Sequence, residues 1–369
     1  MRASANAKTN GKRRLPLAPP SVLPPLYARW MGELLDRPLP REREATCDDC
    51  AMLPAEGEAH DPRVHFDAVA KCCSYLPELP SFLVGGILAG EDGHGRRTVE
   101  ARIDARIGVS PLGLSIPPVY QAQYDLLGET GFGHTRSLRC PHQLDGGLCG
   151  IWLHRNAVCA TWYCKHERGA LGAELWREGI EKLLASVEDA VAAHCMAELG
   201  VDPRGLSAMK PSRKRPSQGM ILDRVDDAKY ALMWGSWVGR ERELYARAAE
   251  IAGALSFHDV LAIAGPQTRL RAANAKRLVR EHASKALPKR LRVGDLKTIA
   301  PGATTFRAVG YSPYDPIELP TELLGVLHRF DGRPTSVVRA QIAKEDGFDL
   351  DVEFLRLLCD FEILVPSGG

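Results

Sequence analysis

The chain has 369 residues, of which 45% are hydrophobic and 25% charged, and its formal net charge is +2. This length suggests two or three domains, and the composition excludes a collagen-like, fibrous or wholly disordered protein. No run approaches the roughly 18 uninterrupted apolar residues of a membrane span, so we expect no membrane segment. The nearly balanced charge also excludes a nucleic-acid-binding polycation. The most informative feature is the count of ten cysteines.

Residues 1–45 begin with a basic stretch that is rich in proline and alanine. They lack the apolar core of a secretory signal peptide, so we expect a cytoplasmic protein. The low periodicity predicts a disordered basic segment. Within it, the pattern over residues 26–35 is that of a short amphipathic helix.

Residues 46–168 hold eight of the ten cysteines together with many glycines, prolines and histidines. Because metal–ligand bonds can replace part of a hydrophobic core, this composition predicts a loop-rich domain stapled by metal. The apolar run 83–88 has the length of a strand or core segment, and residues 119–127 are predicted to be helical.

Residues 169–300 are predicted to form a helical region. Apolar residues recur every three or four positions over 170–199, which predicts one long amphipathic helix that ends at Gly200. A polar connector follows over 202–219. Helical patterns then resume over 223–234, 239–254, 257–264 and 267–286.

Residues 301–369 are predicted to comprise a linker and a C-terminal winged-helix-like unit. Residues 287–318 read as irregular or strand-rich. Helices are expected over 321–330, from Thr335 as an N-cap, and over 351–361, with turns at Asp331-Gly332 and Asp346-Gly347 and a strand at 363–365. The fold class expected for the whole chain is mainly α, with a smaller β contribution (α+β).

The clustered cysteines are the candidate metal ligands: Cys47, Cys50, Cys72, Cys73, Cys140, Cys149, Cys159 and Cys164. Thiolates are soft ligands that suit zinc, iron–sulfur clusters and Cu(I). A C-x-x-C turn brings two sulfurs to one metal site. Disulfides would require an oxidising compartment, and buried free thiols are the other alternative.

The vicinal pair Cys72-Cys73 constrains how these ligands are shared. Adjacent Cα atoms are about 3.8 Å apart, so binding of both sulfurs to one tetrahedral ion would close a small strained ring. We therefore expect the two thiolates to serve different metal ions or different corners of one cluster. Eight ligands match two four-coordinate sites. The alternative is one four-cysteine cluster with the remaining thiols around it.

The cysteine order is C-x-x-C, then CC, then CPHQLDGGLCGIWLHRNAVCATWYC, and it resembles the YkgJ-like zinc- or iron-chelating cysteine-cluster family over about residues 47–166. The family's closing pattern, C-x-x-L…C-x-I-Y-x-x-R-P-x-x-C-x-x-x-x-C, corresponds here to Cys140, Leu144, Cys149, Ile151, Trp152, Arg155, Cys159 and Cys164, with Leu144 one position later than in the pattern and Trp152 as the aromatic residue. Asn156 departs from the usual proline, and 21 residues separate Cys50 from Cys72. The resemblance implies metal binding rather than a particular reaction.

Histidines are also concentrated in this region, because seven of the eleven fall between residues 60 and 166. His142 and His166, each two residues after a cysteine, are the best candidates to replace a thiolate as a ligand. The alternative is that they only support the site. No Ser-His-Asp order, phosphate-binding loop or dinucleotide fingerprint is present, so we assign no catalytic residue.

The charge differs between segments. Residues 201–300 hold 20 Lys/Arg and 10 Asp/Glu, with a basic cluster over 269–292. Such a cluster can attract nucleic acid, or it is simply a solvated helix face. Residues 320–369 hold 5 Lys/Arg and 9 Asp/Glu. Because phosphate contacts dominate DNA affinity, we expect residues 320–366 to bind a protein or peptide partner instead.

The sequence therefore predicts a cytoplasmic metalloprotein that binds zinc or an iron–sulfur cluster and carries a C-terminal protein-interaction module. One alternative is an iron–sulfur-dependent enzyme that modifies a peptide or protein. Another is a metal- or redox-responsive regulator that associates with nucleic acid through its basic central helices. Whether the protein is an enzyme stays open at this point.

Overall fold

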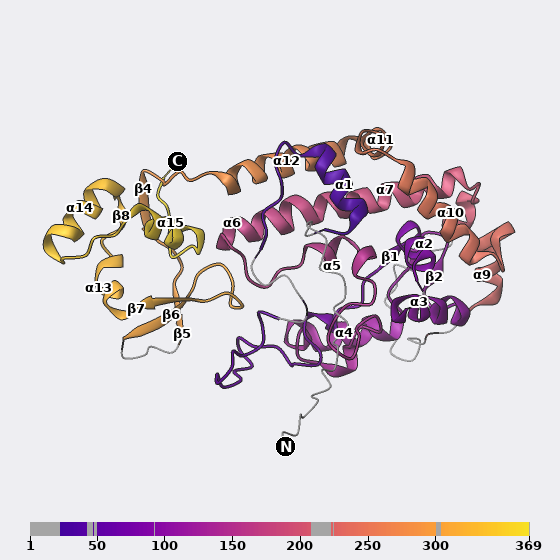
Figure 1. Ribbon diagram of the computed structural model, residues 1–369, viewed down its shortest axis with the longest axis horizontal. Helices are drawn as coiled ribbons and strands as arrows, with labels where there is room; N and C mark the ends of the chain where they lie inside the picture. The colour runs from indigo at the N-terminus through magenta and orange to yellow at the C-terminus, as the bar shows by residue number, and fades with distance from the viewer. Residues whose placement is uncertain are drawn as a thin grey trace, which may run out of the picture.

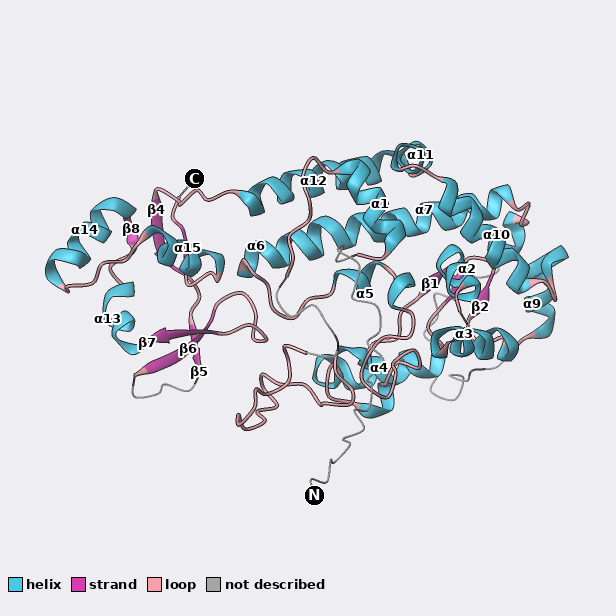
Figure 2. Cartoon of the chain, viewed as in Figure 1, coloured by secondary structure: helices cyan, strands magenta, loops and turns pink. Residues whose placement is uncertain are grey.

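The computed structural model describes residues 23–42, 47, 50–91, 93–207, 223, 225–299 and 304–368. Helices form most of its regular structure, and three small sheets form the rest (Figures 1 and 2). The prediction of a mainly α protein is therefore confirmed. Residues 1–22, which we expected to be disordered, and most of the connector 202–219 lie outside the described residues.

The helices are α1 (Pro25–Leu34), α2 (Ser81–Ala89), α3 (His94–Ala105), α4 (Pro118–Gly131), α5 (Ala157–Thr161), α6 (Gly169–Glu174), α7 (Lys182–Glu198), α8 (Pro203–Ser207), α9 (Asp227–Trp234), α10 (Glu241–Ala254), α11 (Phe257–Ile263), α12 (Gly265–Ala283), α13 (Leu324–Leu327), α14 (Thr335–Glu345) and α15 (Val352–Asp360). The strands are β1 (Leu79–Pro80), β2 (Val109–Ser110), β3 (Gly113–Leu114), β4 (Arg290–Val293), β5 (Lys297–Ile299), β6 (Thr305–Val309), β7 (Ile317–Pro320), β8 (Asp331–Pro334) and β9 (Leu364–Pro366). They form sheets of order β1-β3-β2, β8-β4-β9 and β5-β6-β7, and every pairing is antiparallel.

The long helix predicted over 170–199 is confirmed. It consists of α6, a π-helical stretch over Leu175–Glu181, and α7, in one continuous run beside α12 (Figure 1). Its apolar face is fully buried at Leu183, Val187 and Val191, which explains why the helical periodicity was visible in the sequence. The π-helical stretch was not predicted.

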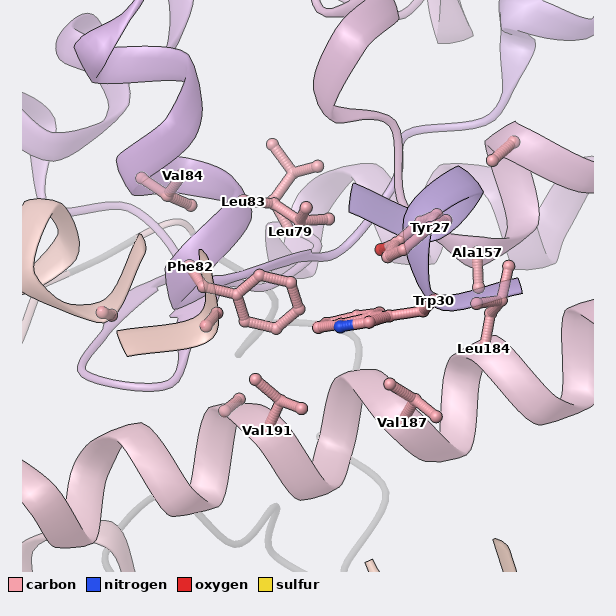
Figure 3. Packing of buried hydrophobic residues seen from close by; sticks show 14 of the residues in the cluster. Tyr27, Trp30, Leu79, Phe82, Leu83, Val84, Ala157, Leu184, Val187 and Val191 are labelled. Atoms are coloured by element: carbon pink, nitrogen blue, oxygen red, sulfur yellow. The ribbon is translucent and has the colours of Figure 1, made fainter. Parts of the chain in front are cut away.

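The segment around α1 is ordered, so the expected disorder of residues 1–45 is wrong for residues 25–34, whereas the alternative helix is confirmed. Tyr27 and Trp30 are completely buried. Figure 3 shows Trp30 between Phe82 of α2 and the apolar face of α7. Burial of two large aromatic side chains outweighs the polar, proline-rich character of the flanking residues.

The apolar run 83–88 is helical and belongs to α2 rather than to a strand. The helix is apolar on nearly all sides because it is buried on nearly all sides, so it carries no periodic signal. Gly85 allows α2 to pack directly on α10, since a Cβ atom there would lie 1.9 Å from the carbonyl oxygen of Tyr245. Helix α3 was likewise not predicted.

Two hydrophobic cores organise the described chain. The first includes buried residues from Leu23 to Val279, so it joins the cysteine-rich region to the central helices. The second includes residues from Leu291 to Leu364. Because β4 pairs with both β8 and β9, the C-terminal unit begins before the predicted boundary at residue 301.

Local details of the C-terminal unit differ from the prediction. Asp331-Gly332 is not a free turn but the start of β8, which is held by pairing with β4. Thr335 is the first residue of α14 rather than its N-cap, and its hydroxyl donates a hydrogen bond to the carbonyl oxygen of Pro288 at 3.0 Å. The helix expected over 321–330 is shorter, with a 3-10 turn at Thr321–Leu323 before α13.

Candidate metal centre

All eight predicted ligands line one cavity of about 800 Å³. Its walls come from segments far apart in the chain: the cysteine-rich loops, α4, α5, the π-helical stretch, and the loop between β6 and β7. The other two cysteines, Cys195 and Cys359, are not among the lining residues. The structure therefore brings the clustered cysteines together and leaves the isolated ones out.

Short local elements position the sulfurs. Cys72 and Cys73 open a 3-10 helix at Cys72–Ser74. The Cys140 amide donates to the carbonyl oxygen of Cys73 at 2.6 Å, which joins the vicinal pair to the second half of the motif. A β-bridge between Gln143 and Cys149 then places Cys149 beside Cys140. The other backbone hydrogen bonds of this glycine-rich stretch are local, such as those from the Leu144 amide to Leu148 and from the Gly147 amide to Leu144.

Helix α5 carries Cys159 and is capped by Asn156. The Asn156 side chain accepts a hydrogen bond from the Cys159 amide at 3.0 Å. Asparagine is a favoured N-cap because its side chain satisfies an amide that the helix leaves free. Asn156 thus fixes the helical turn on which Cys159 lies.

The sulfurs fall into two sets by their electrostatic neighbours. Each member of the first set (Cys73, Cys140, Cys149 and Cys159) interacts with each of the others. In the second set (Cys47, Cys50, Cys72 and Cys164), Cys47 interacts with Cys50 and Cys72, and Cys164 with Cys50 and Cys72. The two sets are also in contact with each other, because the Cys72 thiol donates a hydrogen bond to Cys73 and Cys47 interacts with Cys73 and Cys149. That Cys72 and Cys73 serve different metal ions or different corners of one cluster therefore stays a prediction.

Among the residues that the structure describes, no group of three or more His, Cys, Asp or Glu side chains is arranged to hold a single ion. A mononuclear zinc site draws four sulfurs to within about 2.3 Å of one ion, whereas the four cysteines of an iron–sulfur cluster are shared among two or four iron atoms.

Cationic side chains surround the cysteines. The Arg155 guanidinium interacts with Cys47, Cys73, Cys149 and Cys159. It lies 3.5 Å from the centre of the Trp152 ring and donates to the carbonyl oxygen of Cys159 at 3.0 Å. Lys165 and Arg177 interact with Cys164. Positive charges at these places stabilise thiolates and their metal complexes.

Burial keeps most of these thiols protonated when no metal is bound. It raises the pKa of Cys47 to about 12, of Cys149 to about 11 and of Cys164 to about 12. Cys73 is the exception, since a hydrogen bond from Cys72 lowers its pKa. A bound cation would reverse this balance, because a coordinating thiol loses its proton.

The outer wall of the cavity could not be predicted. The loop between β6 and β7 contributes residues 311–314 to this wall. The Tyr314 ring packs edge-on against the Phe66 ring, with 5.5 Å between the ring centres. Arg177 comes from the π-helical stretch. The sequence around 311–314 shows only a turn pattern, and nothing local indicates that the C-terminal unit docks against the cysteines.

The side chain of one buried acid, Glu188 of α7, contacts the first residue of α5. Its carboxyl group accepts hydrogen bonds from the Tyr27 hydroxyl and from the amide of Ala157, at which α5 begins. Burial raises its pKa from 4.5 to about 8. Glu188 is therefore protonated in the folded protein at neutral pH, and its ionisation is coupled to folding.

We expect Glu188→Gln to change how stability depends on pH. Between pH 4.5 and about 8 the unfolded chain releases this proton while the folded chain keeps it. The wild-type unfolding free energy should thus fall as pH rises through this window, by at most about 1.4 kcal/mol per pH unit. A glutamine side chain does not ionise. In urea unfolding, the unfolding free energy of the variant relative to wild type should therefore be higher at pH 8 than at pH 5.

The matched control is Glu198→Gln, an exposed carboxylate on the same helix. Its unfolding free energy should follow that of the wild type at both pH values. A Glu188 variant that also parallels wild type would mean that Glu188 is ionised in the folded protein.

The remaining predicted features are placed as follows. His142 lines the cavity, whereas His166 is buried outside it. Several residues of the basic stretch 269–292 pair within the molecule, including Arg277 with Glu281 and Arg280 with Asp36. No helix in the described part of the chain is long and apolar enough to cross a membrane.

Comparison of the chain with models of known families, with curated proteins and with solved structures finds no match. The candidate site therefore has to be interpreted from its own residues.

Proposed function

We propose that this protein binds iron–sulfur clusters through two sets of four cysteines, with structural zinc as the alternative that metal analysis must separate. The observation that carries the proposal is that all eight clustered cysteines line one cavity while the two isolated cysteines do not. Buried thiols that act only as small hydrophobic side chains would be expected in the packed core, not together in the lining of one cavity.

The donor chemistry fits such a group. Thiolates are the usual ligands of iron–sulfur clusters, and the cations around them offset the negative charge of a thiolate-bound metal. The Nε atom of Arg155 is buried and has no hydrogen-bond partner among the described residues. A cluster sulfur or thiolate in the cavity would give this donor an acceptor.

The first set (Cys73, Cys140, Cys149 and Cys159) would hold one group and the second set (Cys47, Cys50, Cys72 and Cys164) the other. Iron–sulfur clusters supply one-electron transfer, and a zinc ion would supply folding energy instead. The chain's own residues fix the ligands, exclude water with Trp162 and Phe132, and place Arg155 among the thiolates of both sets.

The surroundings of the site are part of the proposal. The resemblance of residues 47–166 to the YkgJ-like cysteine-cluster family agrees with metal binding, and a reducing cytoplasmic location would keep the thiols available. Helices α13 to α15 with strands β4, β8 and β9 have the content of a winged-helix-like unit. We propose that this unit binds a protein or peptide.

A second candidate function is an iron–sulfur-dependent enzyme that modifies a peptide or protein. The observation that favours it is the size of the cavity, about 800 Å³, which lies in the range of small-molecule binding sites. Aromatic side chains of α4 and of the loop between β6 and β7 line the cavity together with the cysteines.

We expect the protein, purified without oxygen, to contain iron and acid-labile sulfide in equal amounts, at about two or four iron atoms per four-cysteine set. The sample should be yellow-brown, and metal analysis with sulfide determination measures both quantities. A colourless protein that contains zinc would support the alternative of structural ions. A protein that carries neither metal would contradict the proposal.

A further inference from the structure

Two buried histidines share the same local pattern. His142 follows Cys140 by two residues and His166 follows Cys164 by two, and both side chains are almost completely enclosed. In each ring the Nε2 atom is buried without a hydrogen-bond partner among the described residues. A buried polar atom without a partner is costly, so each calls for an explanation.

The Thr98 hydroxyl of α3 lies between two hydrogen-bond partners, the carbonyl oxygen of Gly95 at 2.7 Å and His142 Nδ1 at 2.7 Å. When the hydroxyl donates its single proton to Gly95, it accepts from His142 Nδ1. With its proton on Nδ1, the neutral ring carries a bare lone pair on Nε2. This is the arrangement of a metal-binding histidine, whose second nitrogen donates to an oriented partner.

The position of His142 separates it from His166. His142 is among the residues that line the cysteine cavity, its Nδ1 atom contacts Thr98 of α3, and Arg102 and His94 of the same helix are its electrostatic neighbours. Its backbone amide hydrogen-bonds to Cys140, and its carbonyl oxygen accepts from Gly150 at 2.8 Å. His142 is thereby tied to the two neighbouring cysteines of the first set. His166 contacts Tyr311 and Asp315 instead and is not among the cavity-lining residues.

We propose that His142 Nε2 is a ligand to the metal held by the first cysteine set. This inference rests on the proposed metal binding and adds a nitrogen donor to an otherwise all-sulfur site. The first set then offers four sulfurs and one nitrogen, so one of the five donors stays uncoordinated at a four-coordinate site. A neutral imidazole in place of a thiolate makes the site less negative and raises the reduction potential of an iron–sulfur centre.

X-ray absorption spectroscopy of the full-length, metal-loaded protein tests this proposal at the edge of whichever metal it carries, iron or zinc. The wild type should show a nitrogen scatterer besides sulfur, at about 2.0–2.1 Å if the metal is zinc. His142→Gln should lose this scatterer. His166→Gln is the matched control, because it removes an equally buried histidine with the same free Nε2, and it should keep the scatterer.

A second variant covers the case in which His142→Gln does not fold. Thr98→Val removes the hydroxyl that orients His142 but leaves the ring in place, and loss of such a partner typically weakens metal binding about 10- to 100-fold. Competition with a chelator measures this change. A wild-type spectrum with metal but only sulfur ligands would overturn the role of His142 and leave the proposed metal binding intact. Loss of the nitrogen in His166→Gln alone would overturn it as well, and a metal-free wild type would overturn both proposals.

Discussion

Cys149→Ser should make residues 47–166 sensitive to protease and remove metal from the first cysteine set, whereas Cys359→Ser should do neither. Cys149 follows a glycine-rich turn, in which Gly147 has a φ of +81°, and the backbone hydrogen bonds of this turn are all local. Such a turn has little apolar surface to bury, so we expect the proposed metal bond to supply much of its order. In small metal-stapled domains the metal-binding free energy, about 10–16 kcal/mol for zinc, is also folding free energy.

Cys359 is the matched control because it is a half-buried thiol that lies on α15 and packs against the second core. A serine hydroxyl there costs about 1–3 kcal/mol if it lacks a partner. We expect the second core to stay folded despite this loss of stability. Limited proteolysis of metal-loaded protein, followed by mass spectrometry, distinguishes the two variants. If wild type and both variants resist equally, Cys149 is not a structural ligand and the assignment of the first set is wrong.

The long helices could be predicted because each buries one face and exposes the other. The periodic apolar residues of α7, such as Leu184 and Val187, lie on the buried face. Helix α2 could not be recognised, since it is enclosed on nearly all sides and its sequence carries no alternation. Strand β8 was missed because the local Asp331-Gly332 signal indicates a turn, whereas pairing with the distant β4 decides its conformation.

The candidate site could likewise be predicted from the sequence only in part. The eight cysteines that line the cavity could be selected from their chemistry and their order in the sequence. Arg177 and the wall at Tyr311 and Tyr314 could not, because their place depends on how the C-terminal unit docks. The free lone pair of His142 becomes visible only when the donors and acceptors around Thr98 are counted.

Arg168→Met should loosen the C-terminal unit from the rest of the protein and expose the metal centre. Arg168 precedes α6 and makes a bidentate ion pair with Asp360 of α15, at 2.8 and 2.7 Å, in which both side chains are largely buried. It also donates to the carbonyl oxygen of Ser284 at 2.7 Å, just after α12. Removing one partner of a buried ion pair typically costs about 3–5 kcal/mol, because the other charge stays buried and unpaired.

The matched control is Arg277→Met, which removes the same side chain from an exposed pair with Glu281 on α12. Exposed pairs of this kind contribute about 0–1 kcal/mol, so this variant should unfold like wild type in urea. The double variant Arg168→Met with Asp360→Leu should recover much of the lost stability, since no buried charge is left without a partner. That recovery would separate loss of the ion pair from a general disturbance of the fold.

The docking of the C-terminal unit against the cavity can also be tested by the rate at which metal is lost from the proposed centre. The loop with Tyr311 and Tyr314 belongs to the C-terminal unit and walls the cavity, and Gly169 lets that unit approach closely, because a Cβ atom there would lie 2.2 Å from the carbonyl oxygen of Asp360. Arg168→Met should therefore lose metal to a chelator faster than wild type, and Arg277→Met should not. Equal rates of metal loss in all three proteins would mean that the C-terminal unit does not control access to the cysteines. Faster loss only in Arg168→Met would make the docked unit the barrier between the cluster ligands and solvent.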